Sequence, residues 1–202
     1  MSGSLSNTRE EYGKIARWLH WTMATLLIIG LLAIYYRMWF TEPRTPPSTF
    51  VLQLHMSMGM SLFVFAILRL IWRLKNVQPD PVPGPVWQQN AARWTHRLFY
   101  LFLFMMPITG YIFAGLTNQF FYGTPFAFEL LPKFSDTSAF QAIVVNGLGI
   151  SEEAWRDART PIKNLHVYGG RFVLLALIAL HIGAALYHHF KLRDNTLKRM
   201  LG

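Results

Sequence analysis

Apolar residues are concentrated in four runs along the chain, at about 18–36, 51–72, 94–115 and 165–187, and polar segments separate them. Each run holds about 20 residues, the length that an α-helix needs to cross the hydrocarbon core of a bilayer. Consecutive spans run in opposite directions. The pattern therefore predicts an all-α membrane protein, an antiparallel bundle of four transmembrane helices, formed by residues 1–202 as one domain.

The segments between the runs carry residues that break or start helices. The stretch from Pro79 to Pro85 is rich in proline and is predicted to be extended. The longest connection, about 116–164, is predicted to contain a short amphipathic helix around 151–158. Thr160 and Pro161 are predicted as the N-cap and first residue of the fourth helix, and Ser48 as the N-cap of the second.

Composition agrees with membrane helices, because 52% of the residues are hydrophobic and only 14% are charged. The chain has no cysteine, which excludes disulfides, thiolate metal sites and iron–sulfur clusters. The net charge of +9 would suggest nucleic acid in a soluble protein. Here the basic residues flank apolar runs, so the expected partner is the lipid bilayer with its anionic head groups, and no nucleic acid.

Basic residues also predict the orientation. If the N-terminus is cytoplasmic, twelve Lys and Arg residues lie inside and seven outside, where six acids offset them. The positive-inside rule therefore places both termini in the cytoplasm. The inner set is Arg9, Lys14, Arg17, Arg69, Arg73, Lys75, Arg93, Arg97, Lys191, Arg193, Lys198 and Arg199.

Four histidines occupy matched depths in this bundle. His20 and His55 lie near the starts of the first and second runs, and His166 and His181 lie on the fourth. The last two are 15 residues apart, which is about 22 Å along a helix and about 60° around it, so both face one side. His20 is therefore expected to meet His181 near one membrane face, and His55 to meet His166 near the other.

Two facing imidazole pairs are what two bis-histidine haems require, so the pattern indicates electron transfer across a membrane. Zinc is the competing metal, but it needs a third or fourth ligand, and no carboxylate or cysteine lies near these depths. A single such histidine can also be a polar contact between helices. Gly59, Gly170 and Gly183 leave room for a flat macrocycle, although ordinary helix packing favours small residues too.

Two further histidines are candidates for a quinone or proton site. His188 follows His181 by seven residues, only about 20° off the same face. His96 enters the third helix at a similar level. Either imidazole can hydrogen-bond a quinone carbonyl or relay protons. The alternative is a histidine among the lipid head groups.

Three arginines in or beside the runs need partners. Arg69 is predicted at the depth of the inner haem, where a propionate is the anion available to it. Arg17, one turn before His20, is a similar candidate for cofactor binding. The alternative for both is contact with lipid phosphate. Arg171 has no role that its position indicates.

Several segments match a known family closely. They are YGKIARWLHW from Tyr12 to Trp21, HMSMGMSLFVFAILRLIWRLK from His55 to Lys75, GTPFAFELLP from Gly123 to Pro132, and HIGAALYHHFKLRDNTLKRML from His181 to Leu201. On these motifs the chain resembles the prokaryotic cytochrome b561 family, and more specifically its superoxide oxidase members, over nearly its whole length. The stretch 133–164 matches no motif of the family.

The resemblance implies a four-helix bundle in the bacterial inner membrane that holds two b haems on His20, His55, His166 and His181. It also implies ubiquinone as a partner, near His188. The sharper expectation is an enzyme that oxidises periplasmic superoxide to dioxygen and reduces ubiquinone. Lys163, one turn before His166, is the basic residue best placed to steer the superoxide anion.

The sequence leaves two other interpretations of the function open. The first is a generic quinone-linked electron relay to or from a periplasmic redox protein, or a dehydrogenase or hydrogenase partner, that docks on the long outer loop. The second is a haem-free transporter or structural bundle. A visible spectrum separates the second reading from the others, because b haem colours the purified protein.

Overall fold

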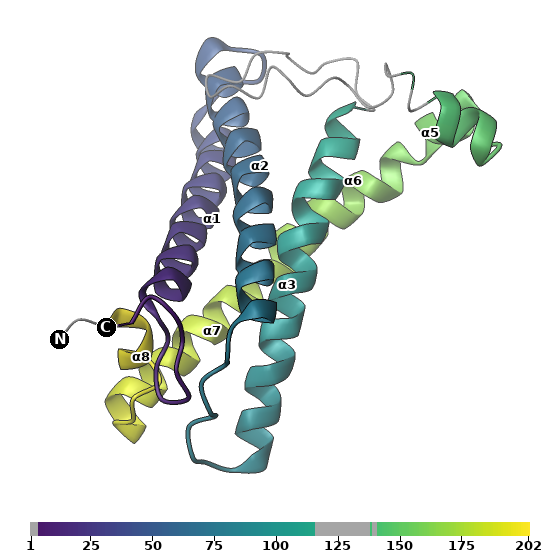
Figure 1. Cartoon of the computed structure of the whole chain (residues 1–202). Coiled ribbons are helices and arrows are strands. Elements are labelled where there is room, and N and C mark those ends of the chain that lie inside the picture. Colours follow the sequence, from purple (N-terminus) through teal and green to yellow (C-terminus); the bar gives the residue numbers. More distant parts are fainter. Residues whose placement is uncertain (1–3, 116–137, 139–140) are drawn as a thin grey trace. The chain divides into compact units, whose positions relative to one another are not determined.

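The computed structural model describes residues 4–115, 138 and 141–202, and this part of the chain is helical with no strand (Figure 1). The first three long helices are α1 (Lys14–Phe40), α2 (Pro46–Lys75) and α3 (Val86–Gly115). Short helices η3 (Gln141–Gly147) and α5 (Glu152–Asp157) follow. Residues 116–137 and 139–140 of the long outer connection lie outside the described residues. The segment Gly123–Pro132 and Lys133 are among them.

The fourth apolar run is not the uniform α-helix that the sequence predicts, because α-helical and π-helical segments alternate along it. It consists of α6 (Arg159–Tyr168), the π-helix η4 (Gly169–Leu174), α7 (Leu175–Tyr187) and the π-helix η5 (His188–Leu192). A short helix, α8 (Lys198–Leu201), comes after it. π-Segments are rare and frequently mark functional sites. The rotation of 100° per residue assumed between His166 and His181 therefore does not hold across η4.

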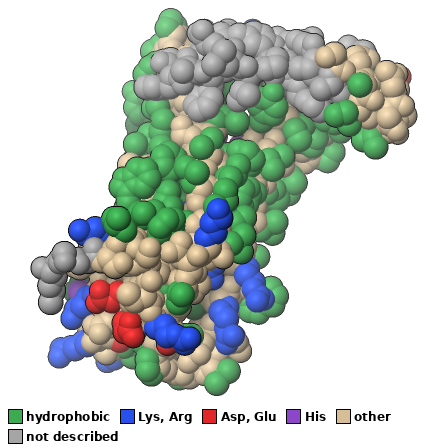
Figure 2. Space-filling view, viewed as in Figure 1, with side chains coloured by type: hydrophobic (Ala, Val, Ile, Leu, Met, Phe, Trp, Pro, Cys, Tyr) green, Lys and Arg blue, Asp and Glu red, His purple; other side chains and the backbone are tan. Residues whose placement is uncertain are grey.

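Within the described residues, four helical segments are long and apolar enough to cross a membrane: Lys14–Phe40, Pro46–Lys75, Val86–Ala114 and Glu153–Leu192. Hydrophobic side chains cover the helices in Figure 2, and many are exposed, such as Leu32 at 65% and Leu180 at 66%. Lipid tails account for such a surface, whereas water does not. The prediction of an all-α membrane protein with four spanning helices is confirmed.

The chain divides into two compact units. Unit 1 comprises residues 1–25, 62–104 and 171–202, and unit 2 comprises residues 26–61 and 105–170. All twelve basic residues predicted to be cytoplasmic belong to unit 1. On the face that Figure 2 shows, the Lys and Arg side chains in view gather in its lower part.

Contacts of α1 with α2 and α8 help to hold unit 1 together. The Arg69 guanidinium on α2 donates to the Ala16 carbonyl on α1 at 2.8 Å. The Trp21 indole on α1 donates to the Met200 carbonyl on α8, also at 2.8 Å. The Trp18 and Phe65 rings meet edge to face, with 5.6 Å between their centres. The C-terminal segment is therefore docked on the first helix.

Three local predictions fall in unit 2. The short helix expected around 151–158 is present as α5, and the Ser151 hydroxyl caps it by accepting the Ala154 N–H at 3.1 Å. The prediction of Thr160 as the N-cap and Pro161 as the first residue of this helix is wrong, because α6 begins at Arg159 after Ala158. Ser48 is also no cap, since α2 begins at Pro46; its buried hydroxyl accepts Arg37 Nε at 3.2 Å.

Candidate functional site

Unit 2 brings His55 of α2 and His166 of α6 together. Their ring centres are 6.1 Å apart, and the ring planes make an angle of 84°. His55 Nδ1 lies 2.8 Å from the Gly30 carbonyl oxygen on α1. His166 Nδ1 lies 3.0 Å from the Met106 carbonyl oxygen on α3. Because a carbonyl only accepts, both Nδ1 atoms carry the proton and both Nε2 atoms keep a lone pair.

This hydrogen-bonding pattern is typical of histidines that bind metals. A ligating imidazole generally donates its second ring N–H to a carbonyl or carboxylate, which fixes both the tautomer and the ring orientation. The Thr109 hydroxyl lies 3.2 Å from His166 Nδ1 and gives the same ring a second polar neighbour. The backbone of α1 and α3 thus orients the two imidazoles of unit 2.

Glycines allow these close approaches. A Cβ atom at Gly110 on α3 would lie 2.9 Å from His166 Cε1, closer than real Cβ contacts, so a larger residue would force this ring to shift. A Cβ atom at Gly30 would lie 3.3 Å from Met58 Cβ, which is a tight contact between α1 and α2. At Gly59, one turn after His55, no heavy atom of the described residues lies within 4 Å of the Cβ position.

Unit 1 brings His20 of α1 and His181 of α7 together. Their ring centres are 6.2 Å apart, with 63° between the planes. His96 of α3 lies beside the same ring, 5.7 Å from His181 between centres, and its Nδ1 bonds to the Ala92 carbonyl at 2.7 Å. Phe99 packs on His181 at 5.2 Å. His96 is therefore a neighbour of the imidazole pair in unit 1.

The spacing of both pairs suits a metal ion between two rings. With a metal–nitrogen bond of about 2 Å on each side, the two ring centres are expected roughly 6 Å apart. The observed separations are 6.2 Å and 6.1 Å. Among the described residues, no group of three or more His, Cys, Asp or Glu side chains is arranged to hold a metal. Zinc therefore finds no third protein ligand there, whereas bis-histidine haem needs only the pairs.

Comparison with known proteins identifies the family. The model of the prokaryotic cytochrome b561 family matches residues 11–202. The chain belongs to this family. It is 28% identical to cytochrome b561 homolog 1 of Escherichia coli K12, over 95% of this chain and 97% of that protein. Cytochrome b561 homolog 2 of the same strain is 29% identical, over 98% and 95%.

A third relative carries a more specific name. The probable superoxide oxidase CybB of Yersinia pestis is 26% identical, over 95% of this chain and 96% of that protein. Membership of the b561 family makes the chain a membrane electron-transfer cytochrome with haem b as its cofactor. The residues present fit that cofactor, since each histidine pair has haem-ligand spacing and unit 2 fixes the tautomers.

The structure shows where the basic residues singled out in the sequence lie. Arg69 lies in unit 1 with His20, where it bonds to α1, and the Arg17 guanidinium lies beside Gly202. Lys163 is exposed on α6, one turn before His166. The exposed Arg171 lies in η4, with its guanidinium 5.7 Å from the Phe172 ring centre. None of these positions contradicts the predicted roles, which stay predictions.

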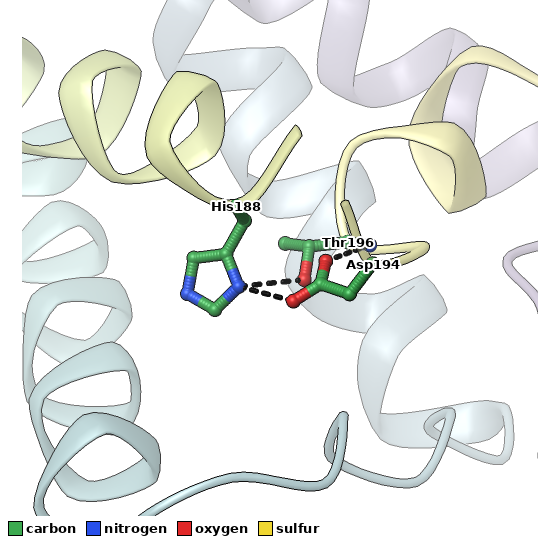
Figure 3. Close-up of polar contacts among 3 residues, drawn as sticks. All are labelled: His188, Asp194 and Thr196. Carbon is green, nitrogen blue, oxygen red and sulfur yellow. Dashed lines mark hydrogen bonds and ion pairs between the residues drawn. The ribbon is translucent and has the colours of Figure 1, made fainter. Parts of the chain in front are cut away.

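His188 has partners that sequence reasoning missed. Its Nδ1 lies 2.5 Å from Asp194 Oδ2 and 3.3 Å from the Thr196 hydroxyl, and all three side chains belong to unit 1 (Figure 3). Asp194 stands out in the sequence only as part of the family motif Asp194–Leu197. Sequence reasoning also missed four residues around the imidazoles of unit 2: Gly30, Gly110, Met106 and Thr109. The first three act through a backbone carbonyl or through the lack of a side chain.

Proposed function

We propose that the chain is a di-haem cytochrome of the bacterial inner membrane that oxidises superoxide and reduces ubiquinone. In this proposal His55 and His166 hold the haem on the periplasmic side, and His20 and His181 hold the haem on the cytoplasmic side. Both termini face the cytoplasm. A b haem at each pair supplies one-electron transfer between ferric and ferrous iron.

The two histidine pairs are the observation that carries this proposal. Each lies on helices that are long and apolar enough to span, and each has the separation that a bis-histidine iron requires. Two sites on spanning helices suit transfer across a bilayer. The positive charge concentrated in unit 1 supports placing that unit at the cytoplasmic face.

The choice of superoxide as donor rests on two supports. One relative is named a probable superoxide oxidase. Lys163 places an exposed positive charge one turn from the ligand His166, and positive charge near an electron-entry site raises the encounter rate of a small anion. The reaction needs no substrate-sized pocket, because the donor only has to approach the haem edge.

Stopped-flow reduction of the purified holoprotein by superoxide tests the proposal. We expect the b-haem absorption to rise within the lifetime of the superoxide pulse, and superoxide dismutase to abolish the rise. Ubiquinone-1 should then reoxidise the haems. If superoxide leaves the haems oxidised while a chemical reductant reduces them, the donor assignment is wrong.

A generic quinone-linked relay is the competing function, and the names of the two E. coli relatives favour it, since they specify no donor. Such a relay would accept electrons from, or pass them to, a periplasmic redox protein or a dehydrogenase or hydrogenase subunit. Haem reduction by superoxide far slower than its spontaneous dismutation, together with rapid quinone-linked turnover, would select this function.

Replacing Lys163 by glutamate is expected to slow reduction by superoxide several-fold at low salt, because the charge near the entry site is inverted. Raising the salt to about 0.5 M should shrink the difference, since the Debye length falls below about 10 Å. Lys198→Glu in unit 1 makes the same change of charge and should leave this rate unaltered. Equal rates for both variants would remove Lys163 from the steering role.

Replacing His188 by alanine is expected to slow haem reoxidation by ubiquinone-1 about tenfold or more, the loss expected when a general acid is removed. Haem content and reduction by superoxide should stay as in the wild type. His189→Ala is the matched control, because the neighbouring ring contacts Phe190 and not Asp194. Unchanged reoxidation in His188→Ala would make His96 the next candidate.

A further inference from the structure

The turn that follows the last long helix carries the side chains that hold His188. The chain reverses at Arg193, which has φ 55° and ψ 32°, in the left-handed region that few non-glycine residues adopt. The N–H groups of Arg193 and Asp194 both point to the His188 carbonyl, as in helix C-caps with a left-handed residue. This reversal returns Asp194 to the side chain of His188.

The contacts of Asp194 are specific. Its Oδ2 atom accepts from His188 Nδ1, and its Oδ1 atom accepts the Thr196 backbone N–H at 2.8 Å. The segment from Lys191 to Gly202 holds four Lys and Arg residues and only this acid. No ion pair between Asp194 and any of these bases is found among the described residues, so the carboxylate is directed at the imidazole.

The Asp194 carboxylate is charged at neutral pH. Partial burial alone would raise the pKa of Asp194, but the hydrogen bonds from His188 and Thr196 outweigh it and hold the pKa below its usual value. A charged acceptor makes the stronger type of hydrogen bond with an imidazole N–H. The Nδ1 atom of His188 is thereby kept protonated.

The other ring nitrogen of His188 is left for a ligand. Nε2 points away from Asp194 and Thr196 in Figure 3, and no protein partner for it is found in the described part of the chain. The His188 side chain is 24% exposed, so the ring is accessible to a small molecule. His188 follows the ligand His181 by seven residues, about 10 Å along the helix axis.

The turn itself is anchored at both ends. It begins at η5, and it ends at α8, which is fixed to α1 by the Trp21–Met200 hydrogen bond. Arg199 Nη1 also donates to the Asp80 carbonyl in the α2–α3 loop at 2.8 Å. A hydrogen-bonding group held on such a support is pre-organised, which is what proton transfer requires of its donor.

We propose that Asp194, supported by Thr196, positions His188 with Nε2 directed at a bound ubiquinone, so that His188 delivers the protons of quinone reduction. The inference rests on the proposed function, because it concerns the same quinone. Ubiquinone takes up two electrons and two protons to form ubiquinol. For each proton, the His188 imidazolium gives its Nε2 proton to a quinone oxygen, and the neutral ring regains it from cytoplasmic water. The electrons come one at a time from two superoxide ions, which leave as dioxygen.

Asp194→Asn tests the inference, since it keeps the shape of the side chain and removes the charge. The holoprotein is reduced with a limiting amount of dithionite without air, then mixed with ubiquinone-1, and haem oxidation is followed. We expect reoxidation to slow about tenfold or more, with haem content and melting temperature unchanged. Asp80→Asn removes a carboxylate of the same unit that has no contact with His188 in the described part of the chain, and it should react as the wild type does.

The combination of variants separates positioning from a structural effect. If Asp194 acts through His188, the double variant Asp194→Asn/His188→Ala is no slower than His188→Ala alone. Multiplied effects in the double variant would overturn the inference, and so would wild-type rates in Asp194→Asn. Thr196→Ser should retain more of the rate than Thr196→Val, because only serine keeps the hydroxyl beside Nδ1.

The donor and acceptor proposals fail in distinguishable ways. If ubiquinone-1 reoxidises the wild-type protein but superoxide does not reduce it, the assignment of superoxide as donor is wrong and the role of Asp194 stands. If ubiquinone-1 does not reoxidise the wild-type protein, both the assignment of ubiquinone as acceptor and this inference are wrong. Rapid wild-type reoxidation with an unaffected Asp194→Asn variant overturns the inference alone.

Discussion

Alanine at His20 or His181 is expected to remove one haem, and alanine at His55 or His166 is expected to remove the other. The physical reason is that each iron has only two protein ligands, and the structure pairs these rings at 6.2 Å and 6.1 Å. A pyridine haemochrome assay normalised to protein should give two haems per chain for the wild type and about one for each variant.

Spectra identify which haem is lost. His20→Ala and His181→Ala should delete the same low-temperature α-band component and the same redox transition. The other two variants should delete the second component. If His20→Ala and His55→Ala remove one common component, the pairing is wrong. A preparation of fully loaded wild type with a single haem would end the two-haem proposal.

Stability has to be measured beside haem content. A bound cofactor stabilises the folded state in proportion to its binding free energy, so a variant that loses a haem should also melt at a lower temperature. His189→Ala, which changes a histidine next to the proposed quinone site, controls for the loss of an imidazole as such. It should keep both haems and the wild-type melting temperature.

The four spans and the depth of the histidines follow from the sequence because both depend only on length. A run of about 20 apolar residues must be a helix in a bilayer, since its backbone has no other way to satisfy its hydrogen bonds. The structure does bring His20 to His181 and His55 to His166. That they bind haem remains the prediction that the variants test.

The π-helical segment in the fourth span could not be predicted from the pattern of apolar residues. A rotation of 100° per residue assumes an unbroken α-helix, but η4 replaces it from Gly169 to Leu174. Consecutive glycines have no side chains to hold the regular winding, and hydropathy does not register a π-segment. The length of the span was predictable, whereas the direction in which each side chain points was not.

The residues that orient the histidines were missed for a related reason. The Gly30 and Met106 carbonyls accept the Nδ1 protons, and every residue type offers the same carbonyl. Asp194 was visible as a charged residue after the helix, but its contact with His188 depends on the left-handed turn at Arg193. Sequence patterns report side chains, and these contacts depend on the path of the backbone.

Valine at Gly110 is expected to expel the haem held by His55 and His166 and to spare the other. A Cβ atom at this position would lie 2.9 Å from His166 Cε1 and 3.3 Å from its Nδ1, and valine adds two methyl groups beyond it. The ring cannot yield easily, because the Met106 carbonyl and Thr109 hydroxyl hold its Nδ1 from the same helix. A ligand displaced by more than about 0.5 Å no longer meets the metal in a productive geometry.

Gly84→Ala is the control for Gly110→Val. It also adds a methyl group at a glycine, but in the α2–α3 loop, where the new Cβ would lie 3.4 Å from Gln88 Oε1. We expect this control to keep both haems, Gly110→Ala to lower the occupancy of one, and Gly110→Val to lose that haem. The spectrum left in Gly110→Val should match that of His166→Ala, because both remove the same ligand. A Gly110→Val protein with two haems and an unaltered spectrum would mean that His166 does not lie against α3 in the loaded protein.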